Sequence, residues 1–286
     1  MKYRSKINFS AGLINLFPII IIMTMPALSF SQSIKVLTYN IRYDNPEDGE
    51  NAWVHRRSEM VKFLLEQNPD IMGFQEVLNR QLEFLKTGLD QYHSLGVGRE
   101  DGISKGEFSP LFFKKEKFDL LDQETIWLSE TPEKPGIGWD AALERIATVV
   151  VLRVKETERQ VVVINTHYDH RGELARLESS KLLLDIIDKR YPGKPLILMG
   201  DLNAEPDSSP VKIFSEELMD TFLCKEKKGP NLTFSGFTNM NYDTGPRIDY
   251  ILIKNFDCLF FQILTPGIGD RNLSDHLPVI SVVEIH

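Results

Sequence analysis

The sequence predicts an α/β fold in which two packed β-sheets carry helices on their outer faces. Three observations lead to this prediction. Short apolar runs that are typical of buried strands recur along the chain, helical patterns separate some of them, and many strands follow one another outside a strict strand–helix–strand order. No internal repeat, low-complexity tract or obvious linker interrupts the pattern, so we expect a single domain over residues 32–286.

Residues 1–31 have the pattern of a targeting segment. Three basic residues and no acidic residue precede or flank an apolar stretch over 13–28, and small residues follow at Ser29 and Ser31. This order predicts a signal peptide that is cleaved near residues 31–32, and therefore an exported protein, periplasmic or extracellular. An uncleaved anchor is the alternative, but the stretch is short for a membrane span and contains two prolines.

Charge limits the partners that we expect. The formal net charge is −8, and it falls to −11 when the leader is removed with its three basic residues and no acidic residue. Such a surface does not attract a polyanion by its overall field, although a local basic cleft or a bound cation could still hold one phosphate. The processed chain shows no long apolar hairpin that could enter a membrane, which argues against a lipid substrate. We expect no stable membrane span after processing, and we expect a monomer. The sequence leaves open whether Cys224 and Cys258 pair.

The first half of the chain alternates strands and helices. Apolar and polar residues alternate over Ile34–Asn40, which predicts a strand, and apolar residues at helical spacing predict a helix over Trp53–Glu66 that ends before Pro69. A short apolar strand over Ile71–Phe74 leads to Gln75 and Glu76. A leucine face predicts a helix over Gln81–Leu89. Further strands are expected over Pro110–Phe113, Phe118–Trp127, Ala147–Val154 and Gln160–Asn165.

The second half contains the strands that we expect at the centre. Val161–Ile164 is a continuous β-branched run, and Leu196–Met199 is an apolar run between Pro195 and Gly200, so both predict strands that are buried on both faces. Glu173–Tyr191 is the strongest helix pattern, with Leu174, Leu177, Leu184 and Ile187 on one side. The last expected strands are Asp249–Ile253, Leu259–Leu264 and Val279–Val283.

Polar groups stand at or near the ends of six apolar segments. They are Asn40, Glu76, His167, Asp201 with Asn203, Asp249, and Asp275 with His276. Such strand ends are common places for chemistry in α/β proteins, and an oxygen-rich set suits a hard cation such as Mg²⁺. Cysteine is absent from the set, which disfavours a zinc site, and neither a Gly-rich phosphate loop nor a G-x-S-x-G motif is present. Taken singly, each group could instead cap a turn.

Six short motifs occur in order along the chain. They are T-Y-N (38–40), Q-E-V (75–77), N-T-H (165–167), G-D-L-N (200–203), R-I-D-Y-I (247–251) and S-D-H-L-P-V (274–279). This series resembles the endonuclease/exonuclease/phosphatase superfamily, the relatives of pancreatic deoxyribonuclease, which include neutral sphingomyelinases, inositol-polyphosphate 5-phosphatases and deadenylases. The resemblance covers about residues 34–286, and the segments S-P-L-F-F, W-L-S-E-T-P and G-W-D-A-A-L-E-R-I are similar to a secreted bacterial branch.

The resemblance implies a four-layer α/β sandwich of two packed mixed β-sheets flanked by helices, and metal-dependent hydrolysis of a phosphoester. By match to the motifs, Glu76 resembles the main metal ligand, with Asn40 beside it and Asp275 near the metal. Mg²⁺ is the expected ion, and Mn²⁺ or Ca²⁺ could replace it. The chemistry of the residues agrees, because a metal and fixed donors can neutralise the charge that develops on a phosphate.

The resemblance also implies roles for the remaining polar groups. Asp201 resembles the acid that activates water or assists the leaving group. His276 resembles the histidine that contacts the scissile phosphate and is oriented by Asp249. Asn203 and His167 resemble donors to the phosphate oxygens.

The substrate is not determined by the motifs. The leading hypothesis is an exported metal-dependent phosphodiesterase or nuclease, and the alternative is a phosphomonoesterase or a lipid, inositol or sugar phosphate hydrolase of the same fold. A third hypothesis is a secreted binding module without catalysis, against which the intact motif set argues. Candidates for substrate recognition are Arg145, Trp139 and Arg42, because arginine can bind a phosphate and tryptophan can stack on a base or sugar.

Overall fold

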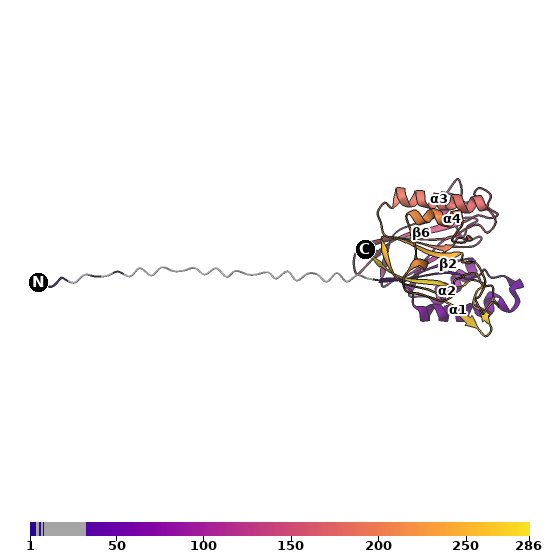
Figure 1. Cartoon of the computed structure of the whole chain (residues 1–286), viewed down its shortest axis with the longest axis horizontal. Coiled ribbons are helices and arrows are strands. Elements are labelled where there is room, and N and C mark those ends of the chain that lie inside the picture. The colour runs from indigo at the N-terminus through magenta and orange to yellow at the C-terminus, as the bar shows by residue number, and fades with distance from the viewer. Residues whose placement is uncertain (4–5, 7, 9–32) are drawn as a thin grey trace. The chain divides into compact units, whose positions relative to one another are not determined.

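The computed structural model describes residues 1–3, 6, 8 and 33–286, so the predicted signal peptide lies almost entirely outside the described residues. Residues 33–286 form four layers, in which two β-sheets lie between an outer pair of helices, α1 and α2, and a second outer pair, α3 and α4 (Figure 1). None of the described helices is long and apolar enough to cross a membrane.

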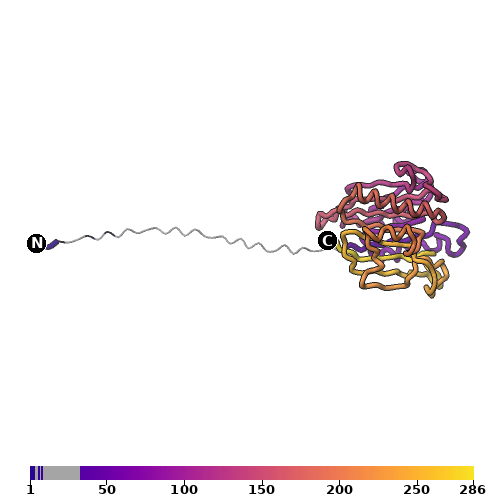
Figure 2. Tube along the Cα trace, turned by 45° about the horizontal axis from the view of Figure 1, so that its top comes forward, coloured from indigo at the N-terminus to yellow at the C-terminus, as the bar shows by residue number. Residues whose placement is uncertain are grey.

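The first sheet has seven strands in the order β10-β12-β15-β1-β2-β4-β3. In this sheet β1 pairs in parallel with β2 and antiparallel with β15, so the last strand of the chain lies beside the first (Figure 2). The bounds are β1 Ser33–Asn40, β2 Ile71–Gln75, β3 Tyr92–Leu95, β4 Leu111–Lys114, β10 Lys227–Lys228, β12 Phe256–Ile263 and β15 Val279–Ile285.

The second sheet has six strands in the order β5-β6-β7-β8-β11-β9, and its parallel pair is β7 with β8. Both sheets are therefore mixed, which confirms the predicted sandwich. The bounds are β5 Phe118–Trp127, β6 Ile146–Val154, β7 Gln160–His167, β8 Leu196–Asp201, β9 Met219–Asp220 and β11 Asp249–Lys254, and a separate small hairpin comprises β13 Gly267–Ile268 and β14 Arg271–Asn272.

The helices pack apolar side chains onto the outer faces of the sheets. Trp53, Met60 and Leu64 of α1 join the cluster on the seven-stranded sheet, and Leu183 and Ile187 of α3 join the cluster on the six-stranded sheet. The bounds are α1 Trp53–Gln67, α2 Asn79–Gly88, α3 Glu173–Arg190 and α4 Ser209–Lys212, with 3₁₀ turns η1 Pro46–Asn51, η2 Ile213–Glu216 and η3 Thr221–Leu223.

The main core lies between the two sheets. The β-branched residues of the central strands, among them Val161, Val163 and Ile197, are completely buried there against Val36 and Ile71 of the other sheet. Burial of a side chain of this size stabilises the fold by about 1.5–3 kcal/mol relative to exposure. The continuous apolar runs of β7 and β8 therefore mark strands with both faces covered, as their sequences predict.

The structure contains short elements that were not predicted, among them β3, β9, β10, the β13–β14 hairpin and α4. The residues of β3, Tyr92–Leu95, show no clear alternation, and the strand forms because it pairs with β4. The buried face of α3 includes Ser179 and Ser180 in place of Leu174, whose exposed fraction is 49%. The small serines allow α3 to approach α4 closely, and the Ser180 hydroxyl donates to the Pro210 carbonyl at 2.7 Å.

The two cysteines are free thiols in the structure. Cys224 is buried, and its Sγ donates to the carbonyl oxygen of Cys258 at 3.1 Å.

The strand register brings the predicted functional groups to one edge of both sheets. In the six-stranded sheet, Asp201 is paired with His167 on one side and with Asp249 on the other. In the seven-stranded sheet, Asn40 is paired with Gln75, so Glu76 follows directly at the same edge. The parallel pairs β1–β2 and β7–β8 thus place residues that are far apart in the sequence side by side.

Candidate active site

The predicted functional side chains surround a cleft of about 520 Å³ at this edge. Asn40 and Asp249 lie next to its lining and contact it, since Asn40 donates to Asp201 and Asp249 accepts from His276. The predicted residues that line the cleft directly are Glu76, His167, Asp201, Asn203, Asp275 and His276.

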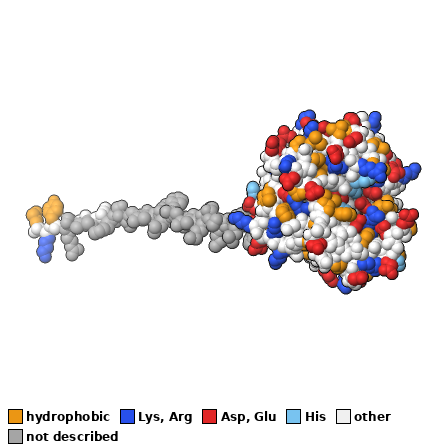
Figure 3. Space-filling view, turned by 45° about the vertical axis from the view of Figure 1, so that its right-hand side comes forward, with side chains coloured by type: hydrophobic (Ala, Val, Ile, Leu, Met, Phe, Trp, Pro, Cys, Tyr) orange, Lys and Arg blue, Asp and Glu red, His pale blue; other side chains and the backbone are white. Residues whose placement is uncertain are grey.

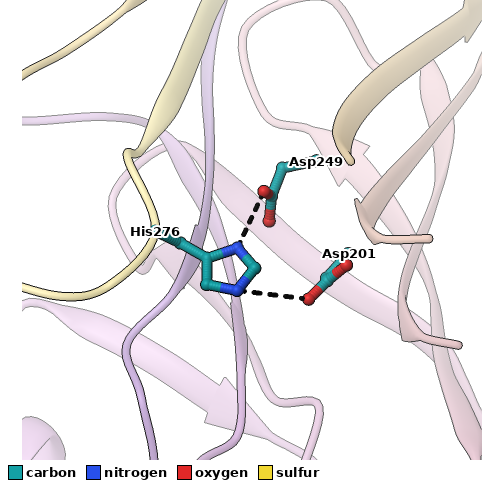
Figure 4. A group of neighbouring side chains, drawn as sticks. All are labelled: Asp201, Asp249 and His276. Atoms are coloured by element: carbon teal, nitrogen blue, oxygen red, sulfur yellow. Dashed lines mark hydrogen bonds and ion pairs between the residues drawn. The ribbon is translucent and has the colours of Figure 1, made fainter. Parts of the chain in front are cut away.

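Asp201, Asp249 and His276 form a buried cluster beside the cleft (Figure 4). Nδ1 of His276 lies 2.9 Å from Oδ2 of Asp249, and Nε2 lies 3.7 Å from Oδ2 of Asp201. Burial lowers the pKa of His276, but the carboxylates of Asp249 and Asp201 outweigh this effect and raise the pKa well above 6.5. The ring is therefore an imidazolium that can donate hydrogen bonds from both nitrogens at neutral pH.

Asp201 is poised to exchange a proton near neutral pH. Burial raises the pKa of Asp201 to about 7, the charge of Asp249 adds to this effect, and His276 opposes it. Two hydrogen bonds orient the carboxyl group, from the Asn203 backbone N–H to Oδ1 at 2.9 Å and from Asn40 Nδ2 to Oδ2 at 3.0 Å. A carboxyl group with such a pKa is suited to general acid–base catalysis.

Two hydrogen bonds hold the Glu76 carboxylate in the cleft lining. The backbone φ of Glu76 is 60°, which lies in the left-handed region that residues other than glycine rarely adopt. Oε1 accepts from Asn40 Nδ2 at 3.1 Å, and Oε2 accepts from the Tyr43 backbone N–H at 3.1 Å. These bonds fix the direction of a carboxylate that the strained backbone turns out of the strand.

The structure offers two groups of side chains that could hold a metal ion. Ligand atoms of Asp201, Asp249 and His276 lie within 4.8 Å of one another, which makes that cluster a possible metal site. The other group is Glu76 and Asp275, both of which line the cleft. It is purely carboxylate, and this chemistry fits a hard divalent cation better than a cluster whose histidine is already protonated.

Arg42 lies between the two carboxylates of this second group. Its Nη1 lies 4.0 Å from Glu76 Oε2, and its Nε lies 3.9 Å from Asp275 Oδ2. Two hydrogen bonds of 3.0 Å from Nε and Nη2 to the Asp48 carboxylate anchor the guanidinium. Burial raises the pKa of Asp275, against the charges of His276 and Arg42. An additional positive charge would stabilise this carboxylate, so the residues fit a divalent cation.

His167 and Asn203 contact each other across the ends of β7 and β8. Asn203 Nδ2 lies 3.1 Å from His167 Nε2 and donates to the Tyr168 carbonyl oxygen at 3.0 Å. Burial, followed by the charges of Arg145 and Arg99, lowers the pKa of His167 well below 6.5. The ring is therefore neutral, and its Nε2 can accept a hydrogen bond from the Asn203 amide.

Three polar residues of this region were not predicted from the sequence: Glu107, Arg99 and His170. Glu107 Oε2 lies 2.7 Å from Arg99 Nη1 and 3.8 Å from His167 Nδ1. An isolated antiparallel β-bridge between Val77 and Phe108 brings Glu107 beside the end of β2. Such a contact between distant residues has no local sequence pattern that predicts it. His170 lines the cleft, and its position three residues after His167 was the available signal.

The three substrate candidates have different surroundings. Arg42 and Arg145 line the cleft, whereas Trp139 is not among its lining residues. Arg145 is 4% exposed; its Nη2 lies 2.9 Å from His170 Nδ1, and its Nη1 is buried without a partner within the described chain. The unsatisfied group makes Arg145 the stronger candidate for contact with an anion.

Comparisons with known proteins agree with this geometry. Residues 37–276 match the model of the Endonuclease/Exonuclease/phosphatase family. A family member from Bacteroides vulgatus of known structure is 33% identical, with a TM-score of 0.86 over 89% of this chain and 100% of that chain. A mannosyl-6-phosphatase from Bacteroides thetaiotaomicron is also 33% identical, with a TM-score of 0.83 over 87% of this chain and 99% of that chain.

A more distant relative in sequence is the probable RNA exonuclease NGL3 of Saccharomyces cerevisiae. It is 30% identical over 213 residues, which cover 65% of this chain and 41% of the yeast protein. The family match spans most of the chain, and the predicted motifs meet in one cleft. This chain therefore belongs to the endonuclease/exonuclease/phosphatase family and is a hydrolase of phosphoric esters.

Proposed function

We propose that this protein is a divalent-metal-dependent phosphatase that acts on small phosphomonoesters. The observation that carries the proposal is the arrangement of the cleft. Asp201, whose pKa is about 7, faces the His276 imidazolium. The two carboxylates of Glu76 and Asp275, which suit a cation, line the same cleft. This arrangement supports hydrolysis in which charge on a phosphate is neutralised while one proton moves.

In this proposal Glu76 and Asp275 hold the cation, and Asn40 orients Glu76. The oxygen donors favour Mg²⁺, and Mn²⁺ or Ca²⁺ have the same ligand preference. A cation bound there supplies positive charge that stabilises the negative charge developing on the phosphate oxygens. Arg42, anchored by Asp48, adds a second fixed positive charge beside the same carboxylates.

Asp201 is the proton-transfer group. It accepts a proton from the water that attacks phosphorus, or supplies one to the oxygen that leaves as the phosphorus–oxygen bond breaks. Its pKa near 7 makes both forms accessible at neutral pH. Its position at the end of a central buried strand fixes the carboxyl group relative to the phosphate.

His276 is a donor to the phosphate oxygens, and the motifs suggest Asn203 as a second donor. Both N–H groups of the Asn203 side chain contact the protein itself, at His167 Nε2 and at the Tyr168 carbonyl oxygen, so one of these contacts is exchanged for the phosphate when the substrate binds. Asp249 keeps the His276 ring charged and oriented through the 2.9 Å contact with Nδ1, which leaves the Nε2–H for the substrate. The motifs suggest His167 as a further donor. Because its neutral ring contacts Asn203, we assign to His167 the orientation of that amide.

A small substrate is supported by size and charge. A cleft of about 520 Å³ is in the range of small-molecule sites. The chain has a net charge of −8, and on the face shown in Figure 3 acidic and basic side chains of the described residues are interspersed without a continuous basic band. Arg145 can receive the second negative charge of a monoester. The related Bacteroides thetaiotaomicron protein is, by its name, a phosphatase of a phosphorylated sugar.

A phosphodiesterase or nuclease is the second candidate. It is the leading hypothesis from the sequence, and the yeast relative, 30% identical, is named as a probable RNA exonuclease. The same catalytic groups would serve a diester, so the difference lies in what the walls of the cleft accept.

A substrate panel decides between the candidates. It comprises hexose 6-phosphates, p-nitrophenyl phosphate, bis-p-nitrophenyl phosphate, RNA, plasmid DNA and sphingomyelin, each with Mg²⁺, with Mn²⁺ and with a chelator. We expect turnover of monoesters that requires the metal and stops with the chelator. Turnover of diesters alone would establish the second candidate, and turnover of none would favour a binding module without catalysis.

We also propose that the protein is exported and acts as a monomer. The support for export is the leader pattern of residues 1–31. Mass spectrometry of the protein expressed with its leader should find a new N-terminus near Gln32. A membrane-bound, full-length chain as the sole species would contradict this and favour the anchor.

A further inference from the structure

A second pocket of about 770 Å³ opens next to the catalytic cleft. It lies between the first turn of α3, the loop from β8 to α4 and the segment 246–248. Asn203 and Ile248 line both the pocket and the catalytic cleft, so the two spaces adjoin. None of the roles assigned above uses this pocket.

Asn203 forms the boundary between the two spaces. Its backbone N–H donates to Asp201 Oδ1 at 2.9 Å, and its side chain contacts His167 and the Tyr168 carbonyl oxygen. A phosphate that is bound between Asp201 and Asn203 would therefore present its ester oxygen close to the pocket. The pocket is placed to receive the group that this oxygen carries.

The pocket wall combines carboxylates with apolar surface. Glu173 and Glu205 are exposed lining residues, and the apolar part of the wall includes Ile248 and Leu174, which is 49% exposed although it belongs to α3. A sugar ring matches such a wall, because its hydroxyl groups can donate to carboxylates while its C–H face packs on apolar side chains.

The same wall disfavours a nucleic acid chain. Among the described residues that line the pocket, Arg176 is the one cation against two carboxylates, and its Nη1 already donates to the Asp169 carbonyl oxygen at 2.9 Å. A second phosphate would meet net negative charge. The pocket lining contains no aromatic side chain from the part of the chain that the structure describes, so an unstacked base would find no stacking platform among these residues.

We propose that this pocket binds the uncharged carbohydrate part of a phosphorylated sugar, and that Glu173 and Glu205 determine this specificity. The inference rests on the proposed function, since it assigns the substrate class of the same catalytic site. Beyond the proposed function, Glu173 and Glu205 are assigned the selection of the leaving group. Their charges also exclude a second phosphate from the position next to the phosphate that reacts.

The test compares KM for substrates that carry a sugar with KM for p-nitrophenyl phosphate, which carries none. With Mg²⁺ present, KM is measured for glucose, mannose and galactose 6-phosphates and for p-nitrophenyl phosphate. Loss of hydrogen bonds to a charged group is worth about 1.5–3 kcal/mol. We therefore expect the double variant Glu173→Gln/Glu205→Gln to raise KM for at least one hexose phosphate by about tenfold or more relative to KM for p-nitrophenyl phosphate.

A matched control is Glu66→Gln, an exposed glutamate on α1 in the opposite outer layer, which should leave the ratio of the two KM values unchanged. Charge reversal by Glu205→Lys should in addition improve kcat/KM for a nucleoside 3′,5′-bisphosphate relative to a nucleoside monophosphate. Ratios that are equal in wild type, pocket variants and control would overturn the inference while turnover of p-nitrophenyl phosphate still supports the proposed function.

Binding measured without turnover separates the two proposals further. Calorimetric titration of the same hexose phosphates into the Mg²⁺-loaded Asp201→Asn variant, which lacks the proposed proton-transfer group, gives a dissociation constant without turnover of the ligand. Affinity that is weakened by the two pocket substitutions would support the carbohydrate pocket even if no substrate were hydrolysed. Absence of binding, or binding that the substitutions leave unchanged, would refute it.

Discussion

Glu76 shows how single residues carry the site. A left-handed backbone costs a residue with a side chain about 1–2 kcal/mol. The conformation persists because Asn40 and the Tyr43 backbone N–H each donate to one oxygen of the carboxylate. Arg42, which has a φ of 58°, lies beside it. Residues that are strained in this way and held by several partners are concentrated at functional sites.

Glu76→Gln should lower both metal affinity and turnover, because it removes a negative ligand and keeps the side-chain shape. We expect kcat/KM for p-nitrophenyl phosphate to fall by about 10²-fold or more, in the range typical of electrostatic catalytic groups. Isothermal titration with Mn²⁺ measures the affinity, and the exposed Glu47→Gln is the control. Unchanged metal binding in the Glu76 variant would remove this residue from the metal site.

Asp249 and His276 should behave as one unit. Their contact of 2.9 Å means that removal of either partner disables the same donor. We expect His276→Ala to reduce kcat strongly, Asp249→Asn to reduce it less, and the double variant to match His276→Ala, because losses within a unit are not additive. A double-variant cycle in kcat/KM makes the comparison. Fully additive losses would show that Asp249 acts independently of His276.

At the scale of elements, α3 and the loop over 128–145 are joined at the N-terminus of the helix. Asp140 accepts from the backbone N–H groups of Ala175 at 2.6 Å and Leu174 at 3.3 Å, so a residue 35 positions away caps the helix. Gly172 permits this contact, since a Cβ there would lie 2.5 Å from Asp140 Oδ1. The cap links the loop that ends near Arg145 to the helix that borders the second pocket.

Asp140→Ala should lower the free energy of unfolding by about 1 kcal/mol, the usual effect of a lost helix N-cap. Denaturant titration measures the change, and Asp188→Ala, an exposed position later in α3, is the control. Asp140→Asn should retain most of the stability, because its side-chain oxygen can still accept. Equal effects of Asp140→Ala and Asp188→Ala would mean that the cap does not contribute.

At the scale of the whole molecule, the meeting of two sheets concentrates ionisable groups in a buried edge. His167 illustrates the consequence, because burial lowers its pKa well below 6.5 while the unfolded chain keeps a pKa near that value. As pH falls below about 6.5, the unfolded state takes up a proton that the folded state does not. The stability contributed by neutral His167 is present above this pH and is lost as pH falls. The ionisable groups around the ring are Arg99, Glu107, Arg145, His170, Asp201 and His276.

Unfolding measured between pH 7 and pH 5 should therefore show a steeper loss of stability in wild type than in His167→Gln. One such histidine contributes a slope of at most about 1.4 kcal/mol per pH unit. His55→Gln, at the exposed surface of α1, is the matched control and should keep the wild-type slope. Identical slopes for wild type and His167→Gln would contradict the neutral buried state.

Local patterns were sufficient for most of the fold. A continuous β-branched run identified β7, a continuous apolar run identified β8, and the expected bounds of β5 are the observed ones. These predictions succeed because burial on both faces leaves an apolar run that neighbouring residues alone reveal. The face of α3 was predicted in part: Ile187 and Leu184 pack on the sheet, but leucine spacing cannot show that Ser180 packs against α4.

The sequence by itself determined which residues of the site stand at strand ends, because each motif joins an apolar run to a polar group. Only the tertiary structure decided how they meet. The pairing of Asp201 with both His167 and Asp249 depends on strand order, and the bridge between Val77 and Phe108 helps to bring Glu107 to the cleft. The buried state that shifts the pKa values of Asp201 and His276 arises when two sheets close over one edge. No segment read alone contains that information, since desolvation is a property of the packed molecule.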